Sequence, residues 1–157
     1  MMGEDGSADL IHLADDENSV VVRVLRRHRP GLPQWHDHLD AEVLVESRFV
    51  NGRLAFCLAP RDLDSWAEAL ESLADGRDVG WLEDGHTPEF RFELNSQYEV
   101  PAVIVEDASG SGASVCVPVD VPDEWVADLR SRLERVLQVW PRETVRSAPG
   151  TYEWRRK

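Results

Sequence analysis

The chain has 157 residues and a formal net charge of −13 at pH 7, from 30 acidic and 17 basic side chains. A surface this acidic repels phosphate backbones, which argues against a nucleic-acid partner. Hydrophobic residues make up 42% of the chain, enough for the core of one domain. No apolar run reaches the roughly 18 residues of a membrane span. The acidic N-terminal segment lacks the positive charge of a signal peptide, so we expect a soluble, cytoplasmic protein that does not contact membranes.

The distribution of charge divides the chain into three segments. Residues 1–18 carry six acidic side chains and no lysine or arginine, which predicts an acidic leader that ends in at most a short edge strand. Residues 19–141 form the predicted domain. Residues 142–157 carry five basic and two acidic side chains, and we expect this basic tail to pack on the same domain. Its opposite sign favours contact with the N-terminal leader.

The first part of the domain has the pattern of β-strands. Residues 19–26 are rich in β-branched side chains, and the following residues 28–38 contain the prolines and glycine of a loop. Residues 40–48 and 53–59 alternate between apolar and polar side chains, the period of a strand. Between them, Asn51 and Gly52 predict a type I′ hairpin turn that pairs these strands antiparallel.

Two segments have the spacing of amphipathic helices. One follows Pro60 and ends near Gly76, with apolar residues at Leu63, Trp66, Leu70 and Leu73. The other begins near Pro122 and ends before Pro141, with an apolar face formed by Trp125, Leu129, Leu133, Val136, Leu137 and Trp140. Four further strands are predicted between the helices, at residues 79–82, 89–94, 98–107 and 113–119.

These elements predict an α+β fold, with an antiparallel sheet system of about six or seven strands covered by two helices. A shift of 59 residues also superposes Cys57 on Cys116 and Trp66 on Trp125. This match is typical of a duplicated hairpin–helix unit, although two helices that follow strands can match by chance. The two cysteines are too few for a disulfide framework, so we expect buried thiols, with a bridge between them as the alternative.

One loop contains residue types that bind metals. His36 and His38 alternate on an extended segment beside Asp40 and Glu42, and two imidazoles with a carboxylate suit zinc or iron. Their spacing matches no zinc motif, however, and polar loops collect such residues. No sequence motif for a nucleophile or a phosphate-binding loop is present either. We therefore predict no catalytic residue, no metal ligand and no cofactor, and keep a small metal-dependent enzyme or metal sensor at the His36/His38 loop as the alternative.

The six tryptophans indicate where a partner could bind. Trp66, Trp125 and Trp140 belong to the helix faces, whereas Trp35, Trp81 and Trp154 lie outside the strong periodicities. Exposed aromatic side chains near acidic ones suit a protein interface. The candidate binding residues are therefore Trp35, Trp81, Glu83, Asp84 and Trp154.

Several motifs together resemble a known family. They are V-V-V-R-V, D-A-E-V-L-V, N-G-R-L, D-L-D-x-W, W-L-E-D-G and R-F-E-L, followed by Val139-Trp140-Pro141. With the opening L-I-H-L-A-D and the ending Tyr152-Glu153-Trp154-Arg155, the chain resembles an uncharacterised bacterial family of unknown function. In layout, residues 19–141 are similar to the WapI-type immunity proteins, which protect bacteria from polymorphic toxins.

The expected function is therefore a non-catalytic protein-binding module. The resemblance implies an immunity-like protein that neutralises a toxin by occlusion. The acidic surface would accelerate its encounter with a basic partner. Self-association through the exposed aromatic residues is a further alternative, and the sequence does not determine the oligomeric state.

Overall fold

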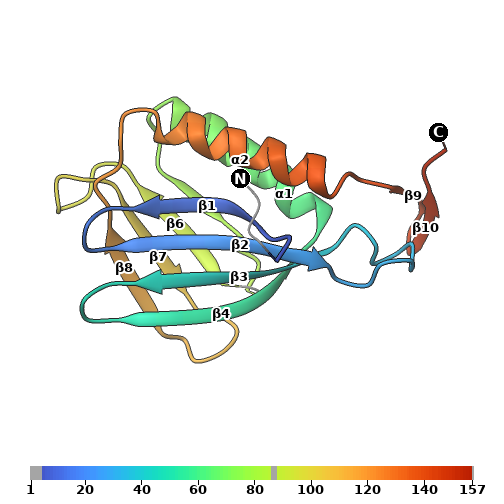
Figure 1. Cartoon of the computed structure of the whole chain (residues 1–157), viewed down its shortest axis with the longest axis horizontal. Helices are drawn as coiled ribbons and strands as arrows, with labels where there is room; N and C mark the ends of the chain where they lie inside the picture. The colour runs from blue at the N-terminus through green and yellow to red at the C-terminus, as the bar shows by residue number, and fades with distance from the viewer. Residues whose placement is uncertain (1–4, 86–87, 157) are drawn as a thin grey trace.

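The computed structural model describes residues 5–85 and 88–156, and Figure 1 shows how their elements are arranged. The fold is α+β, with antiparallel strands and two helices. The first half contains β1 (Ala8–Ala14), β2 (Ser19–Arg27), β3 (Leu39–Glu46), β4 (Asn51–Leu58) and α1 (Pro60–Ala74). The second contains β5 (Val79–Trp81), β6 (Glu89–Glu93), β7 (Ala102–Glu106), β8 (Ser114–Pro118) and α2 (Trp125–Val139), and it is followed by β9 (Thr144–Ala148) and β10 (Thr151–Trp154).

The strands form three sheets rather than one system of six or seven. The first sheet has the order β1-β2-β3-β4, the second has the order β5-β6-β7-β8, and β9 pairs with β10 alone. The predicted number was too low because strands also form in the two end segments. β1 lies in the segment predicted as a leader, and its Leu10 and Ile11 are fully buried. The folded domain thus begins before residue 19.

The turn between β3 and β4 lies earlier than predicted. Residues 47–50 form it, and Asn51 and Gly52 are instead the first two residues of β4, where they pair with Glu46 and Val45. The Ser47 hydroxyl accepts hydrogen bonds from the backbone N–H groups of Phe49 (3.2 Å) and Val50 (2.8 Å). This local side-chain capping stabilises a turn that the Asn-Gly signal misplaced.

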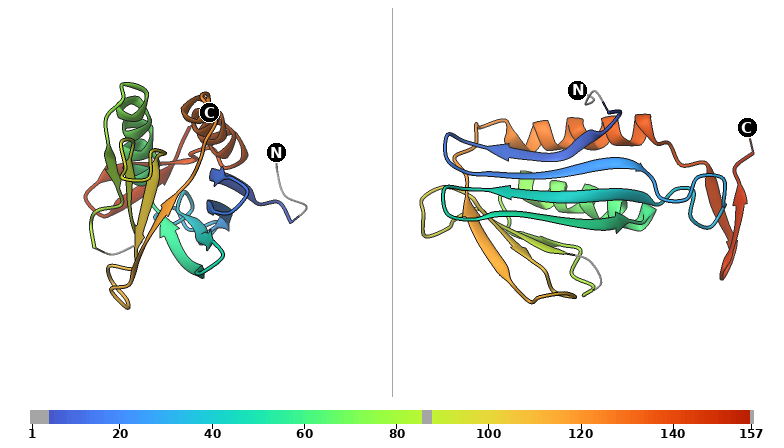
Figure 2. Two further views of the ribbon diagram at one scale, coloured as in Figure 1. Left: turned by 90° about the vertical axis from the view of Figure 1, so that its left-hand side faces the viewer. Right: turned by 60° about the horizontal axis from the view of Figure 1, so that its bottom comes forward.

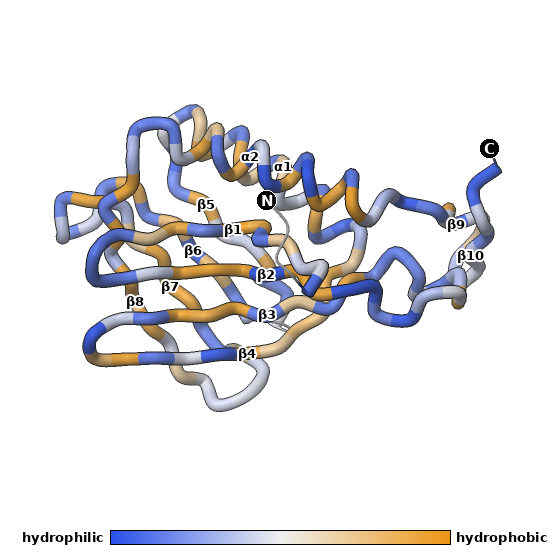
Figure 3. The backbone as a smooth tube through the Cα atoms, viewed as in Figure 1, coloured by the Kyte–Doolittle hydropathy of each residue, from blue (hydrophilic) through white to orange (hydrophobic). Residues whose placement is uncertain are grey.

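The two four-stranded sheets enclose a common core. Alternate residues of each sheet point inward, such as Val20, Val22 and Val24 of β2, and Figure 3 shows this apolar material along the strands. Contact between the sheets is direct, because the rings of Phe56 and Phe90 have centroids 6.2 Å apart. Trp66 of α1 is fully buried and completes the core against Trp81 and Phe92, at 4.8 Å and 5.3 Å.

The order of elements repeats: four antiparallel strands and then a helix, twice. The 59-residue shift predicted a smaller unit of one hairpin and one helix, and it aligns the helices only in part, because α1 begins at Pro60 and α2 at Trp125. Each helix lies next to the other unit's sheet. α1 packs beside β5, α2 packs beside β1, and the helices lie side by side (Figures 1 and 2). The two units therefore share one core, and neither buries its apolar surface alone. Neither helix in the described part of the chain has the length and apolarity that crossing a membrane requires.

Candidate functional site

A hairpin formed by β9 and β10 extends from one end of the first sheet, beside the β2–β3 loop (Figure 1). The buried side chain of Asp37 fastens it there. The Asp37 carboxylate accepts hydrogen bonds from the backbone N–H groups of Glu143 (3.0 Å) and Thr144 (3.0 Å) and from the Thr144 hydroxyl (2.8 Å). It also pairs with Arg27 at 3.1 Å. The basic tail thus packs on the domain through a network of defined hydrogen bonds.

Electrostatics explain why this network is stable. Burial by itself would raise the pKa of Asp37, but the hydrogen bonds from Glu143 and Thr144, with Arg27 nearby, outweigh it and lower the pKa below its ordinary value. Arg27 also donates to the Pro141 carbonyl at 2.8 Å and to the Glu143 carboxylate at 2.9 Å. The charged side chains between loop and hairpin are therefore mutually satisfied.

Exposed apolar side chains gather at this end of the molecule. Trp35 is 38% exposed and Leu32 is 47% exposed on the β2–β3 loop, while Val145 and Trp154 are 41% and 46% exposed on the hairpin. Loop and hairpin touch through His36, whose ring packs edge-on against Trp154 at 4.7 Å. The strand register places Val145 on the face of the hairpin opposite Trp154, because Trp154 pairs with Thr144 and Val145 pairs with Glu153. We call the surface formed by Leu32, Trp35 and Trp154 the aromatic end.

The five predicted binding residues lie at three different places in the structure. Trp35 and Trp154 are exposed at the aromatic end. Trp81 is not a surface residue, because its ring packs against Trp66 and its indole N–H donates to the Asp62 carbonyl at 2.9 Å. Glu83 and Asp84 are exposed on the β5–β6 connection and line a shallow cavity with Asp62 at the start of α1.

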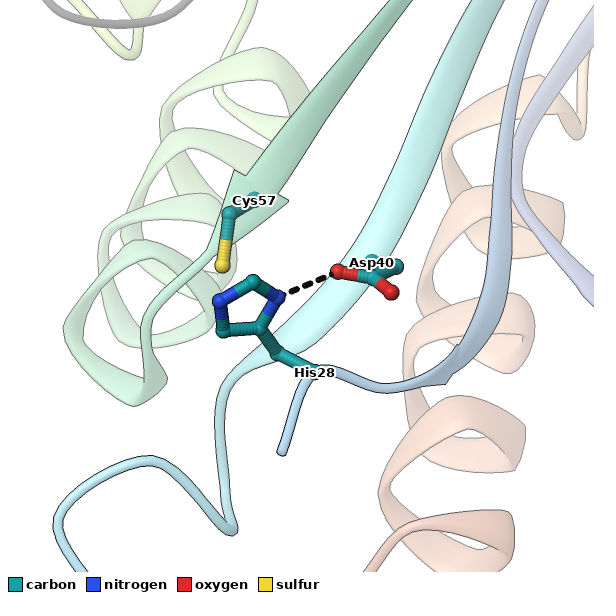
Figure 4. A group of neighbouring side chains, drawn as sticks. All are labelled: His28, Asp40 and Cys57. Carbon is teal, nitrogen blue, oxygen red and sulfur yellow. Dashed lines mark hydrogen bonds and ion pairs between the residues drawn. The ribbon is translucent and has the colours of Figure 1, made fainter. Parts of the chain in front are cut away.

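A second group of side chains lies near the base of the β2–β3 loop. His28, Asp40 and Cys57 each offer one potential ligand atom within 4.8 Å of the others. The His28 Nδ1 atom is 2.7 Å from an Asp40 carboxylate oxygen. Figure 4 shows the Cys57 sulfur beside the other ring nitrogen, on the side of the imidazole away from Asp40. Cysteine, histidine and aspartate are thus brought together from three segments of the chain.

The strand register creates this group. Asp40 of β3 pairs directly with Cys57 of β4, so both side chains lie on the outer face of the first sheet. An irregularity of the β2–β3 pairing between Val24 and Arg26 turns the end of β2, and the His28 N–H then donates to the His38 carbonyl at 2.8 Å. The Trp35 ring lies edge-on to His28 at 6.1 Å.

The electrostatic environment of this group is negative. Burial, followed by the charges of Asp40 and Asp62, raises the pKa of the Cys57 thiol to about 11. Burial also raises the pKa of Asp62, and burial together with His28 lowers the pKa of His38. At neutral pH the thiol is therefore protonated, and it can act as a nucleophile or a ligand only if a base or a cation removes its proton.

The His36/His38 loop, kept as the alternative metal site, does not bring its two imidazoles together on one point. The His36 Nε2 atom lies 3.0 Å from the Glu143 carboxylate, and its Nδ1 atom accepts a hydrogen bond from Gly31 N–H at 3.0 Å. Both ring nitrogens are thus occupied, while the His38 ring packs against Trp35 at 5.1 Å. Of the residues considered for metal binding in the sequence, the group found in the structure contains only Asp40.

Sequence reasoning missed His28 and Cys57 as partners of Asp40. Both were placed in ordinary elements, one at the start of a loop and one in a strand. The available signal was the alternation of the two paired strands, which places Asp40 and Cys57 on the polar face. Cys57 and Cys116 are both free, on different sheets, so the described structure contains no bridge between them.

These features define a two-sheet α+β protein with a docked C-terminal hairpin. The chain belongs to a family of unknown function, DUF5959, whose model matches residues 8–141. The hairpin lies beyond the matched region. No significant match was found among curated proteins or among solved structures, so the similarity of layout to WapI-type immunity proteins is not confirmed.

Proposed function

We propose that this protein is a non-catalytic binding module that engages a protein partner through the aromatic end. The observation that carries the proposal is the presence of Leu32, Trp35 and Trp154 at one end of the molecule, each at least 38% exposed, with loop and hairpin in contact through His36 and Trp154. Tryptophan is enriched among the residues that dominate binding energy at protein interfaces. Exposed aliphatic neighbours add apolar area around such anchors.

The way the hairpin is held favours this role. Binding is weakened when loops and side chains must be ordered in the complex. Here the Asp37 hydrogen bonds to Glu143 and Thr144 and the His36–Trp154 contact order both parts of the surface in the free protein. The free surface is therefore preorganised for contact.

Charge indicates the chemistry of the partner. The net charge of −13 attracts a basic protein over long range and raises its association rate. An immunity-like role, in which the module covers the active surface of a basic toxin, is the specific form of this proposal. The acidic surface supports it.

The test is a quantitative capture experiment from native lysate with tagged full-length protein. We expect a partner recovered in stoichiometric amount by the wild type, and at least tenfold less recovery by the double variant Trp35→Ala/Trp154→Ala. Phe49→Ala is the matched control, because Phe49 is 95% exposed. It belongs to the turn between β3 and β4, which lies at the opposite end of the first sheet from the hairpin (Figure 1). Its recovery should equal that of the wild type.

The association rate of the captured partner, measured against ionic strength, tests the charge argument. It should fall as salt is added if the partner is basic. Equal recovery by the wild type and the double variant, with both folded, would contradict the proposed surface. A rate that rises with salt would contradict the basic partner while leaving the surface intact.

A further inference from the structure

We propose that His28, Asp40 and Cys57 form a binding site for a transition-metal ion, with Zn²⁺ as the best match. The site adjoins the aromatic end, because the Trp35 ring lies edge-on to His28 at 6.1 Å, but none of its three residues belongs to that surface. It uses three residue types that bind zinc in proteins. Asp40 and Cys57 come from β3 and β4, and His28 is the first residue of the β2–β3 loop. The grouping rests on the fold, because Asp40 and Cys57 are brought opposite each other by the β3–β4 register.

The geometry is close to that of a bound site. One ligand atom from each residue lies within 4.8 Å of the other two. In tetrahedral zinc sites, bonds of about 2.0–2.3 Å hold ligand atoms about 3.5 Å apart. The Asp40 oxygen and His28 nitrogen, now 2.7 Å apart, would separate slightly to admit the ion. Small side-chain rotations are therefore sufficient, and the strands need not move.

The ligand atoms select the type of metal. Magnesium and calcium prefer sites made of oxygen atoms alone, whereas a thiolate with an imidazole selects zinc and similar ions. A divalent cation also balances the charges of Asp40 and of a deprotonated Cys57. Asp62 lies close enough to act on Cys57 electrostatically and adds to the negative potential. The chain thus supplies three ligands and leaves one position for water or a group from a partner.

The orientation of His28 supports this assignment. Its backbone is fixed by the hydrogen bond to the His38 carbonyl, and its ring lies against the edge of Trp35. Trp35 in turn lies under the Arg29 guanidinium at 5.8 Å. Neighbours that orient a ligand in advance reduce the reorganisation required for metal binding. His28 and Asp40 are both about one-third exposed, which gives an ion access from solvent.

The experiment is a titration of chelator-treated full-length protein with Co²⁺, which reports thiolate ligation through a charge-transfer band, followed by displacement with Zn²⁺. We expect one ion per chain and a thiolate band in the wild type. Cys116→Ser is the matched control and should keep the band, because Cys116 is an exposed thiol opposite Ile104 on the second sheet. Cys57→Ser should abolish it, and His28→Ala and Asp40→Ala should each weaken binding at least tenfold.

A second measurement does not depend on the folding of variants. Zn²⁺ added to the wild type should protect Cys57, and not Cys116, from alkylation by iodoacetamide, as measured by peptide mass spectrometry. The absence of both the cobalt band and the protection would overturn the proposal. A band that survives Cys57→Ser, or rapid His28-dependent alkylation of Cys57 without metal uptake, would also overturn it, the latter in favour of a nucleophilic cysteine.

Discussion

Each four-stranded sheet carries a cysteine on its last strand, and the two cysteines have different surroundings. Cys57 on β4 pairs across the sheet with Asp40 and lies near His28, whereas Cys116 on β8 pairs with Ile104 and is exposed. The difference arises largely from the β2–β3 loop, which begins at His28 and also contains Asp37. Among the described residues, a group of side chains that could hold a metal ion is thus found in the first unit and not in the second.

The C-terminal hairpin adds to this difference between the two four-stranded sheets. It docks on the β2–β3 loop through Asp37, next to the His28 group, and so places both candidate sites at the same end of the first sheet (Figure 1). The second sheet contributes mainly core residues such as Phe90 and Phe92. The first unit and the hairpin therefore carry the candidate sites, while the second unit completes the core that both units need.

The largest expected effect concerns the tryptophans related by the 59-residue shift. Trp66 is fully buried between the units, whereas Trp125 is only partly buried at the start of α2. Trp66→Ala should lower the free energy of unfolding by about 4 kcal/mol, and Trp125→Ala by less than half of that. Chemical denaturation of both variants measures the difference. Equal losses would show that the two helices contribute alike.

Asp37 tests the attachment of the hairpin. Because its carboxylate is buried and paired with Arg27, Asp37→Asn should reduce stability by about 3 kcal/mol or release the hairpin from the loop. Tryptophan fluorescence should report the exposure of Trp154 if the hairpin is released. Thr151→Ala, on the exposed part of the hairpin, is the control and should change little.

The pKa of Asp37 adds a pH dependence to this prediction. Its pKa is lowered in the folded protein, so its contribution to stability is complete above the ordinary aspartate pKa of about 4 and is lost as the pH falls through the folded value. Unfolding measured from pH 6 downwards should therefore lose this component in the wild type and not in Asp37→Asn. Parallel pH profiles would contradict the assignment.

The two thiols should differ in reactivity in metal-free protein. Cys116 is exposed, whereas Cys57 is partly buried with a pKa raised to about 11. Since the thiolate is the reactive form, iodoacetamide at pH 8 should label Cys116 at least tenfold faster. Peptide mass spectrometry over time gives both rates in one sample. Faster labelling of Cys57 would contradict the effect that burial is expected to have on its thiol.

The smallest expected effect compares the last turns of the two sheets. Ser47 caps the β3–β4 turn by accepting hydrogen bonds from the N–H groups of Phe49 and Val50, so Ser47→Ala should cost about 1 kcal/mol. Ser111 lies in the exposed β7–β8 turn. Its backbone N–H donates a hydrogen bond to the Asp107 carboxylate, and this bond does not depend on the serine side chain. Ser111→Ala should therefore cost about half as much. Denaturation midpoints measure both, and a larger effect at Ser111 would reverse the comparison.

The sequence predicted the elements whose side chains follow one regular period. Both helices and the central strands were found because their buried residues alternate or recur at helical spacing. β1 was only partly recognised, because an irregularity between Asp9 and Ile11 buries Leu10 and Ile11 in succession. The strand β9 was missed because it is exposed along most of its length, although Pro149-Gly150 marks the turn that follows, with Gly150 at φ 76°.

The candidate sites were less predictable than the fold. Trp35 and Trp154 were predicted to be exposed because they lie outside the regular spacing of the helices and strands. The same criterion wrongly included Trp81, which is buried. The His28–Asp40–Cys57 group requires the strand register and the bend at the end of β2, which are properties of the folded sheet. Local patterns cannot supply contacts that depend on pairing between distant strands.

We propose that the end formed by the β2–β3 loop and the hairpin binds the partner. Hydrogen–deuterium exchange of the protein, alone and with its captured partner, tests it most directly. We expect added protection at residues 28–38 and 144–154 in the complex, and none at the 47–50 turn at the opposite end of the sheet. Protection confined to β5–β8 or to the 47–50 turn would contradict the account.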